Sequence, residues 1–351
     1  MQKTEQCHLP ISVIIPVYNA EKYLDISLQS LKNQIFGDFE VLIVDDCSSD
    51  SSLDICRKYV AEDIRFKLFC HSENKGPGAA RNTALKNAAG ETVFFLDADD
   101  SLNPDSLNLL YRKFKRFNVD IVVGGVETFD EQNGKSLIIK GDILRGFQKI
   151  RDVACHYLKQ PNKSRIFSFS WGRLFRRSLL EKHGLLFDES MVVFEDVAWN
   201  FQYGCFADSM LIIDDIVYRY RIPAMSHVSM GGGVDNIHKI MTPLILRRHI
   251  DDFIKISDLP EFSVIADDCV TNLIIIYFIR TCLFLNIKNF IQYYRAVYQL
   301  LRNCDLQKCI RNYNFLPGRS RFLPLFMRYK TVIPVLLIGK YKALKRYKKE
   351  R

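Results

Sequence analysis

The first 125 residues alternate short apolar runs with stretches in which apolar positions recur at helical spacing. The apolar runs predict five strands, at 11–15, 39–44, 66–70, 92–96 and 120–123. Apolar residues at 24, 28, 31 and 35 predict a first helix over about 24–35. Capping and small residues predict three more, from 48–52 to Glu62, over 79–89 and from Pro104 onward. Nearly continuous apolar strands that alternate with helices indicate a Rossmann-like α/β fold, whose mostly parallel sheet has helices on both faces.

The pattern changes after about residue 125. Trp171 to His183 and Glu195 to Phe206 have helical spacing, whereas Ile212 to Arg221 indicates one or two strands. Three glycines at 231–233 indicate a flexible break, and the chain beyond about 236 is mainly helical in pattern. The expected organisation is a sheet domain, a helical region and a tail, over 1–235, 236–318 and 319–351 respectively.

Composition narrows the class of protein. The 351 residues are 48% hydrophobic and 25% charged, which is typical of a globular chain and excludes a disordered protein or a small disulfide scaffold. The ten cysteines form no Cys-x-x-Cys pair, and residues 1–10 contain no apolar run of a signal peptide. We therefore expect a cytoplasmic protein with free thiols.

The positive charge is concentrated at the C-terminus. Residues 319–351 hold eleven Lys or Arg and one acid, so that the remainder of the chain has a net charge of −1. Such a distribution argues against a nucleic-acid-binding surface. The tail also contains apolar side chains among its bases, which predicts contact with an anionic membrane surface at the inner face of the cell membrane. The alternative is a solvated basic tail with one helix packed on the body.

A transmembrane helix is not expected. The longest apolar stretch runs from Leu273 to Leu285, short of the ~20 residues that span a bilayer, and Arg280 interrupts it.

Acidic residues follow two of the predicted strands. Asp97, Asp99 and Asp100 lie within four residues, and Asp46 ends the second strand. Open parallel sheets bind ligands at the carboxyl ends of their strands. Three adjacent carboxylates suit a divalent cation that completes its shell with substrate phosphate oxygens. The alternative is a solvated acidic turn before the helix that begins at Pro104.

Other candidates have equally plain alternatives. Arg81 follows a Gly-Pro-Gly turn and is positioned to reach a diphosphate or to hold a neighbouring acid. The ring of Tyr18 is expected either to stack on a nucleobase or to pack against the protein. Glu195 and Asp196 open a helix, where acids ordinarily serve as dipole partners, unless the fold brings them opposite the Asp97–Asp100 cluster.

Taken together, these motifs resemble family-2 glycosyltransferases, which have the GT-A fold. The motifs that carry the resemblance are Ile11-Ser-Val-Ile-Ile-Pro-Val-Tyr-Asn19, Val44-Asp-Asp46, Asn74-x-Gly76, Ala80-Arg-Asn82, Gly90-Glu91, Leu96-Asp-Ala-Asp-Asp100, Trp171-Gly-Arg-Leu-Phe-Arg176, Glu195-Asp196 and Tyr218-Arg-Tyr-Arg221. The resemblance covers about residues 10–230. Cys47 is a departure, because many members have Gly there.

The resemblance implies a role for each matching residue. The donor side would comprise Pro16, Tyr18, Asp46, Arg81, Asp97 and Asp99. A divalent metal, Mg²⁺ or Mn²⁺, would be held by Asp99 with help from Asp100. Asp196 would be the catalytic base with Glu195 in support, and the acceptor side would comprise Trp171, Ser226 and His227.

The function that this resemblance implies is that of an inverting hexosyltransferase. It would move a sugar from a nucleotide-diphosphate donor, with UDP the expected nucleotide, to a hydroxyl of a glycan or lipid-linked acceptor. A sugar nucleotidyltransferase is an alternative, although it usually needs a Gly-rich loop and residues 16–23 contain no glycine. A non-catalytic assembly protein with the GT-A fold is the other alternative.

Overall fold

The computed structural model describes residues 9–131, 134–139, 144–161, 166–191, 193–222, 239–314 and 320–347. The chain folds as two compact units, the first of residues 1–154 and 163–224 and the second of residues 155–162 and 225–351. The boundaries expected at 235 and 318 stay predictions.

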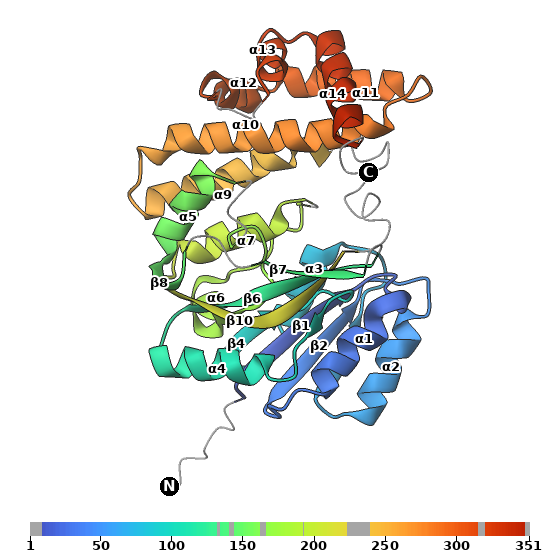
Figure 1. Cartoon of the computed structure of the whole chain (residues 1–351), viewed down its shortest axis with the longest axis vertical. Helices are drawn as coiled ribbons and strands as arrows, with labels where there is room; N and C mark the ends of the chain where they lie inside the picture. The colour runs from blue at the N-terminus through green and yellow to red at the C-terminus, as the bar shows by residue number, and fades with distance from the viewer. Residues whose placement is uncertain are drawn as a thin grey trace. The chain divides into compact units, whose positions relative to one another are not determined.

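One half of the first unit is a parallel sheet. Its strands are β1 (Ile11–Val17), β2 (Phe39–Asp45), β3 (Phe66–Cys70) and β4 (Thr92–Phe95). The helices that connect them are α1 (Glu21–Lys32), α2 (Ser52–Glu62) and α3 (Pro77–Leu85) (Figure 1). The strand order is β3-β2-β1-β4, and every pairing among these strands is parallel. The loops after β1, β2 and β4 therefore meet at one edge.

The other half of the sheet is mixed. It continues from β4 through β9 (Arg173–Arg176), β6 (Ile121–Asp130), β10 (Ser209–Ile222) and β5 (Ser101–Leu102), with β7 (Lys135–Ile139) and β8 (Gly146–Lys149) at its margins. β6 and β10 run parallel, whereas β9 is antiparallel to both β4 and β6. The expected α/β fold with helices on both faces is confirmed.

The helix expected over 171–183 is wrong in its first half. Residues 173–176 form β9, and α6 begins only at Arg177 and ends at His183. Leu174 and Phe175 are fully buried because β9 lies between two other strands. A four-residue segment with only two apolar residues has no periodicity that distinguishes a strand from the helix that follows it.

The remaining helices of this part of the chain are α4 (Ser106–Phe117), α5 (Ile150–Lys159) and α7 (Glu195–Gly204). A buried aromatic cluster fixes α7 to the sheet. The ring of Trp199 on α7 stacks on Phe187 at 4.3 Å and lies edge-on to Phe95 at 5.6 Å and Phe175 at 5.9 Å. Because Phe95 ends β4, the first turn of α7 is held close to the acidic residues that follow that strand.

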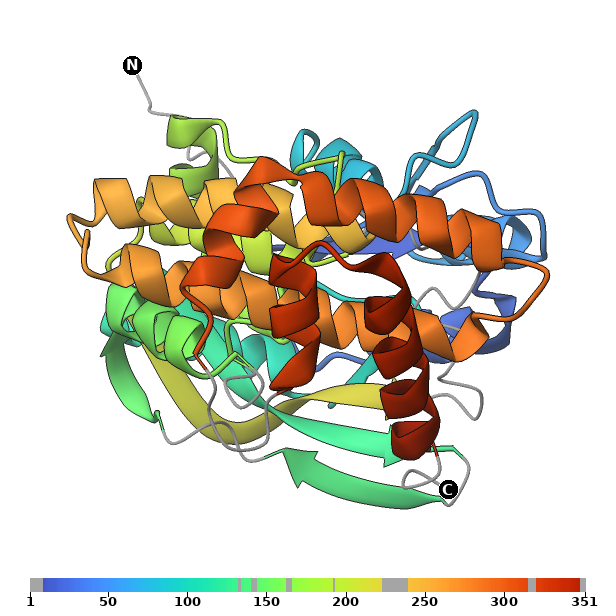
Figure 2. The ribbon, with the colours of Figure 1, turned by 90° about the horizontal axis from the view of Figure 1, so that it is seen from above.

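The second unit is helical, as expected for the C-terminal region. Its helices are α9 (Thr242–Ile256), α10 (Phe262–Thr281), α11 (Phe290–Arg302), α12 (Cys304–Arg311), α13 (Phe322–Arg328) and α14 (Val332–Tyr347). α9 and α10 lie side by side (Figure 2), and the buried Arg247 of α9 pairs with the buried Asp267 of α10 at 2.9 Å. α14 approaches α10 closely at Gly339, where a Cβ would lie 2.6 Å from the ring of Phe278.

One helix of the described residues, Phe262–Phe284, is long and apolar enough to cross a membrane by length and composition. Its mean hydropathy is 1.7, and 67% of its most apolar window is buried inside the protein. Core helices have the same properties, so this segment is weak evidence for a membrane span.

Candidate active site

The loops after β1 and β2 are tied to each other. Asn19 and Cys47 both have left-handed backbone conformations, with φ of 48° and 64°. Asn19 of the first loop and Glu21, the first residue of α1, exchange backbone-to-side-chain hydrogen bonds of 2.8–3.1 Å with the second loop. Their partners are Ser48, Ser49, Asp50 and Ser51. The sequence departure at Cys47 thus falls on a position where a side chain is sterically disfavoured.

Asp46 is fixed by the loop after β3. The residue is 2% exposed, and its carboxylate accepts hydrogen bonds from the backbone N–H of Lys75 at 2.9 Å and of Gly76 at 2.7 Å. The Nδ1 atom of His71 lies 2.6 Å from the same carboxylate, and its Nε2 atom lies 2.8 Å from the hydroxyl of Thr83. His71 therefore orients Asp46.

The other predicted nucleobase residues lie on the same edge. Pro16 is in β1, opposite Val44 of β2, and the backbone N–H of Asp46 donates to the carbonyl of Val17 at 2.8 Å. Tyr18 follows directly and is 51% exposed, so its ring is open to a ligand. Their roles in nucleotide binding stay predictions.

Arg81 of α3 is the centre of a cluster of acids. Its guanidinium is buried, and Nη2 donates to Asp97 at 2.9 Å. Its Nη1 atom lies 3.5 Å from Glu195 and 3.7 Å from Asp196, and the ring of Phe187 lies 5.3 Å from its central carbon. Acids at the end of β4 and at the start of α7 are therefore brought together around one cation.

Glu195 and Asp196 occupy the first turn of α7, which follows Phe194 in a left-handed conformation. The hydroxyl of Ser170 donates to Asp196 at 2.6 Å. Burial, followed by the charge of Asp196, raises the pKa of Glu195 to about 7, although Arg81 counters part of this shift. The condition that would make these two acids functional, proximity to the Asp97–Asp100 segment, is met.

The three acids after β4 have different surroundings. Asp100 is 1% exposed and accepts from the hydroxyl of Tyr218 at 2.7 Å and from the backbone N–H of Arg221 at 2.8 Å. Burial and the neighbouring carboxylates raise the pKa of Asp100, and burial also raises the pKa of Asp97. Asp99 is half-buried, and burial with the charge of Asp97 raises its pKa to about 6.

A metal ion fits this segment only with a ligand from the substrate. Within the described residues, no group of three His, Cys, Asp or Glu side chains is arranged to hold a metal by itself. Asp97 and Asp100 accept from the side chains of Arg81 and Tyr218, whereas no side chain of the described ranges donates to Asp99. Magnesium and manganese ions use one or two carboxylates together with phosphate oxygens, so Asp99 fits such a site.

Trp171 lies in a stack of aromatic rings. Its ring is 4.5 Å from that of Phe169, 4.5 Å from that of Tyr218 and 5.4 Å from that of Tyr220, nearly parallel in each case. Gly172, with φ of 71°, makes the turn that follows it. Two other predicted acceptor residues, Ser226 and His227, and the glycines at 231–233 lie outside the described residues.

Some residues of this region were not singled out from the sequence. Ser170 contacts Asp196, and Arg221 donates to the carbonyl of Asp99 at 3.0 Å and pairs with Glu131 at 3.1 Å. Arg221 is the last residue of the Tyr218-Arg-Tyr-Arg221 motif, but its place in that motif does not indicate which acid it contacts. Ser170 has no sequence signal.

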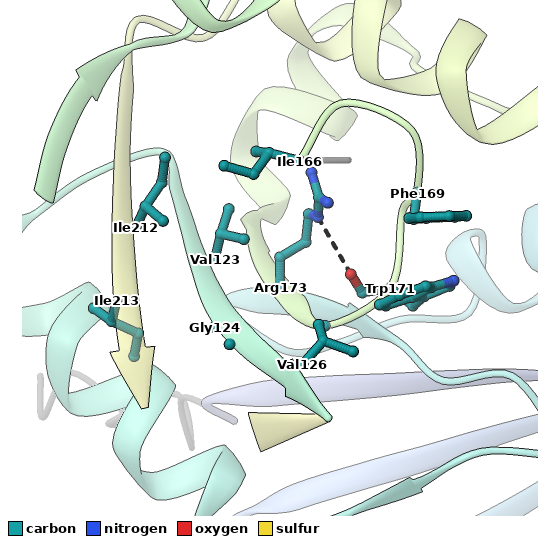
Figure 3. A pocket seen from close by; sticks show the side chains of 11 residues that line it. Val123, Gly124, Val126, Ile166, Phe169, Trp171, Arg173, Ile212 and Ile213 are labelled. Atoms are coloured by element: carbon teal, nitrogen blue, oxygen red, sulfur yellow. Dashed lines mark hydrogen bonds between the residues drawn. The ribbon is translucent and has the colours of Figure 1, made fainter. Parts of the chain in front are cut away.

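A small cavity adjoins the aromatic stack (Figure 3). It has a volume of about 50 Å³. Its walls are formed by β6, β10 and the segment that leads into β9, through Val123, Gly124, Gly125, Val126, Ile166, Phe169, Trp171, Gly172, Arg173, Ile212 and Ile213. The walls are apolar except at Arg173.

The fold and the acid cluster are those of a GT-A domain. Residues 12–184 match the model of glycosyl transferase family 2, so this domain is similar to that family, as the sequence motifs indicated.

Known proteins agree with this assignment. The chain is 35% identical over 220 residues to the putative glycosyltransferase EpsH of Bacillus subtilis, which covers 62% of each chain. It spans less than two thirds of the curated relatives that it matches. The structure of residues 1–349 of TarS from S. aureus in complex with UDP-GlcNAc is similar with a TM-score of 0.69, at 22% identity, over 96% of this chain and 92% of that one. The structure of the mannosyltransferase PcManGT from Pyrobaculum calidifontis, in complex with GDP-Man and Mn²⁺, is similar with a TM-score of 0.51 at 17% identity. The match covers 98% of this chain and 88% of that one.

Proposed function

We propose that this chain transfers a sugar, with inversion, from a nucleotide-diphosphate donor to a hydroxyl of a glycan or lipid-linked acceptor. UDP is the expected nucleotide, which is also the nucleotide of the ligand in the TarS structure. The observation that carries the proposal is the convergence of Asp97, Glu195 and Asp196 on the buried Arg81. Acids from two distant segments meet where the fold binds its ligands.

Asp196 is the proposed general base. Inversion by a single in-line displacement needs a group that takes the proton of the acceptor hydroxyl as the new bond forms. The hydrogen bond from Ser170 and the proximity of Arg81 fix the Asp196 carboxylate, while its attachment to the first turn of α7 limits its movement. Glu195, whose pKa is raised to about 7, lies beside it and supports it electrostatically.

A divalent metal is the proposed cofactor, with Asp99 as its ligand and Asp100 in an assisting position. When bound, the ion neutralises charge on the leaving nucleoside diphosphate. Asp97 keeps its hydrogen bond to Arg81 and so separates the metal side from the acceptor side of the cluster. The Mn²⁺ in the PcManGT complex supports this part of the proposal.

The second unit is proposed to contact the cytoplasmic face of an anionic membrane. Four apolar side chains of α14 are 43–65% exposed and three or four positions apart, at Ile333, Leu337, Tyr341 and Leu344. Lys and Arg residues lie among them, at 340, 342, 345 and 346. An exposed apolar stripe with basic neighbours is typical of helices that lie in a membrane interface.

Sedimentation with vesicles of anionic lipid tests the membrane contact. The double substitution Leu337→Glu and Tyr341→Glu should release the protein, because it places two acids on the stripe. Val264→Glu, at an apolar side chain of α10 that is 56% exposed, is the matched control and should sediment like the wild type. Equal sedimentation of the double variant and the wild type would exclude α14 as the membrane contact.

The test of the catalytic proposal is thermal unfolding with UDP, GDP, CDP and dTDP, each with and without Mn²⁺. A ligand at a hundred times its dissociation constant stabilises a fold by about 2.7 kcal/mol. Stabilisation by one nucleotide that depends on the metal would support the donor class and the metal. Stabilisation by a nucleotide that does not depend on Mn²⁺ would contradict the proposed metal cofactor. No stabilisation by any combination of nucleotide and metal would favour a non-catalytic assembly protein.

A further inference from the structure

Arg173 has the surroundings of a residue that binds an anion. It lies on β9, where it pairs with Val123 of β6, and it is 3% exposed. Its Nε atom donates to the carbonyl of Trp171 at 3.3 Å, while its buried Nη1 atom has no hydrogen-bond partner. Arginine is rarely buried in a protein without a partner for its charge.

A second arginine of the same strand shows the usual arrangement. Arg176 donates to Asp120 at 3.2 Å, to the side chain of Asn118 at 2.9 Å and to the carbonyl of Val119 at 2.8 Å. No carboxylate of the described residues lies within 4 Å of the Arg173 guanidinium. Burial lowers the pKa of Arg173 to about 10, although the charge of Asp196 offsets part of this shift.

The cavity at Arg173 has room for a small polar group. Figure 3 shows the side chain rising from β9 beside Ile166, inside the loop that leads to Trp171. A buried water needs about 10–15 Å³ on the scale used for this cavity. The volume of about 50 Å³ thus accommodates a few waters or one small oxyanion. The apolar walls provide no other charge to pair with the guanidinium.

We propose that this cavity binds an oxyanion group of the acceptor, a phosphate or a carboxylate, through the guanidinium of Arg173. A guanidinium presents parallel N–H donors that match both groups. The inference rests on the proposed function, because the acceptor must approach the base: Asp196 is near enough to act on Arg173 electrostatically, and Trp171 forms a wall of the cavity. The acceptor therefore carries a negative charge close to its reacting hydroxyl.

Thermal unfolding in sodium phosphate, sodium acetate and sodium chloride at equal ionic strength tests the site. The wild type should melt at a higher temperature in phosphate or acetate than in chloride, and Arg173→Met should lose that difference. Arg219→Met is the matched control, because Arg219 is 56% exposed in the same unit and its loss changes the net charge equally. This control should respond to the anions like the wild type.

The two anions distinguish the acceptor classes. A response to phosphate alone indicates a phosphate-bearing acceptor, a response to acetate alone indicates an acidic sugar, and a response to both supports the site for either group. No response of the wild type, or an equal response of Arg173→Met, would overturn the proposal.

The stability of the variant in chloride separates binding from a structural role. Arg173→Met should melt at or above the temperature of the wild type, because it removes a buried charge that has no partner. A melting temperature well below that of the wild type, for both Arg173→Met and Arg173→Lys, would overturn the proposal. Metal-dependent stabilisation by a nucleotide is measured on the same variants, so its absence would contradict the proposed function without affecting the anion result.

Discussion

Two regions of the first unit bury carboxylates in opposite ways. At the end of β2, the proposed nucleotide side, the carboxylate of Asp46 accepts hydrogen bonds from the loop after β3, so its charge is satisfied by the protein itself. Between the end of β4 and the start of α7, Asp97, Glu195 and Asp196 gather around the guanidinium of Arg81. The carboxylate of the first region has its hydrogen bonds supplied by the protein, whereas the second region holds more acids than cations.

The surplus of negative charge in the acid cluster is what a catalytic site would need. Raised pKa values at Asp97, Asp99 and Glu195 all have burial as their largest cause. Buried acids with perturbed pKa values cluster where catalysis requires them, although structural networks produce them as well. A bound metal ion and an acceptor hydroxyl would interact with this charge, and the following predictions test whether it serves that purpose.

The largest effect is expected at Asp196. Asp196→Asn should lower sugar transfer by about 10²–10⁴-fold, because it removes the proton acceptor while it keeps the shape of the side chain. Steady-state transfer assays measure the rate, and thermal unfolding with the nucleotide checks that binding survives. Glu181→Gln, an exposed acid of α6, is the control. Normal transfer by Asp196→Asn would eliminate it as the base.

Removal of Arg81 should cause the largest loss of stability. Arg81→Met removes a buried cation from three partly buried acids, and the free energy of unfolding should fall by about 3 kcal/mol near pH 7. Urea denaturation measures this change, which should be smaller at pH 5, where Glu195 with its pKa of about 7 is protonated. An equal loss at both pH values would show that Arg81 acts by packing alone.

The pH dependence of stability provides a third test. The pKa of Glu195 is about 7 in the fold and 4.5 as its ordinary value, so the folded state binds more protons between these pH values. The stabilisation is complete below pH 4.5 and is lost as the pH rises through 7. The free energy of unfolding of Glu195→Gln should therefore exceed that of the wild type by about 3 kcal/mol at pH 8 and match it near pH 4.5. Parallel pH profiles of the two proteins in urea denaturation would contradict this assignment.

The smallest effect is expected on the nucleotide side, at Cys47. Its φ of 64° is disfavoured for a residue with a Cβ, so Cys47→Gly should raise the free energy of unfolding by about 0.5–1 kcal/mol. Cys47→Ala keeps the Cβ and should give no gain in urea denaturation. A gain with alanine would attribute the effect to the thiol instead.

Much of the fold could be predicted because its central strands are buried on both faces. The runs at 11–15 and 39–44 lie within the buried strands β1 and β2, and the run at 66–70 matches β3, the partly exposed strand at the edge of the sheet. β9 could not be predicted, since its identity as a strand depends on pairing with β4 and β6, far away in sequence. The helix α3 ends at Leu85 rather than near Ala89, because the small residues there have no apolar period to mark its end.

The candidate site was predictable as a set of residue types but not as contacts. Carboxylates at strand ends indicated where charge would gather. The pairing of Arg81 with Glu195 and Asp196 joins segments more than 110 positions apart, which no local spacing indicates. Arg173 could not be chosen as a candidate from the sequence, because its interest depends on a buried Nη1 atom without a hydrogen-bond partner.

The ties between the loops after β1 and β2 affect how the sheet edge moves. Asn19 and Glu21 hold the Ser48–Ser51 segment through hydrogen bonds in both directions, so neither loop can open without breaking its bonds to the other. In native-state hydrogen exchange, the backbone amides of both loops should then be released in one cooperative event. The two loops that flank the proposed nucleotide pocket would thus behave as one mechanical element, although about thirty residues separate them along the chain.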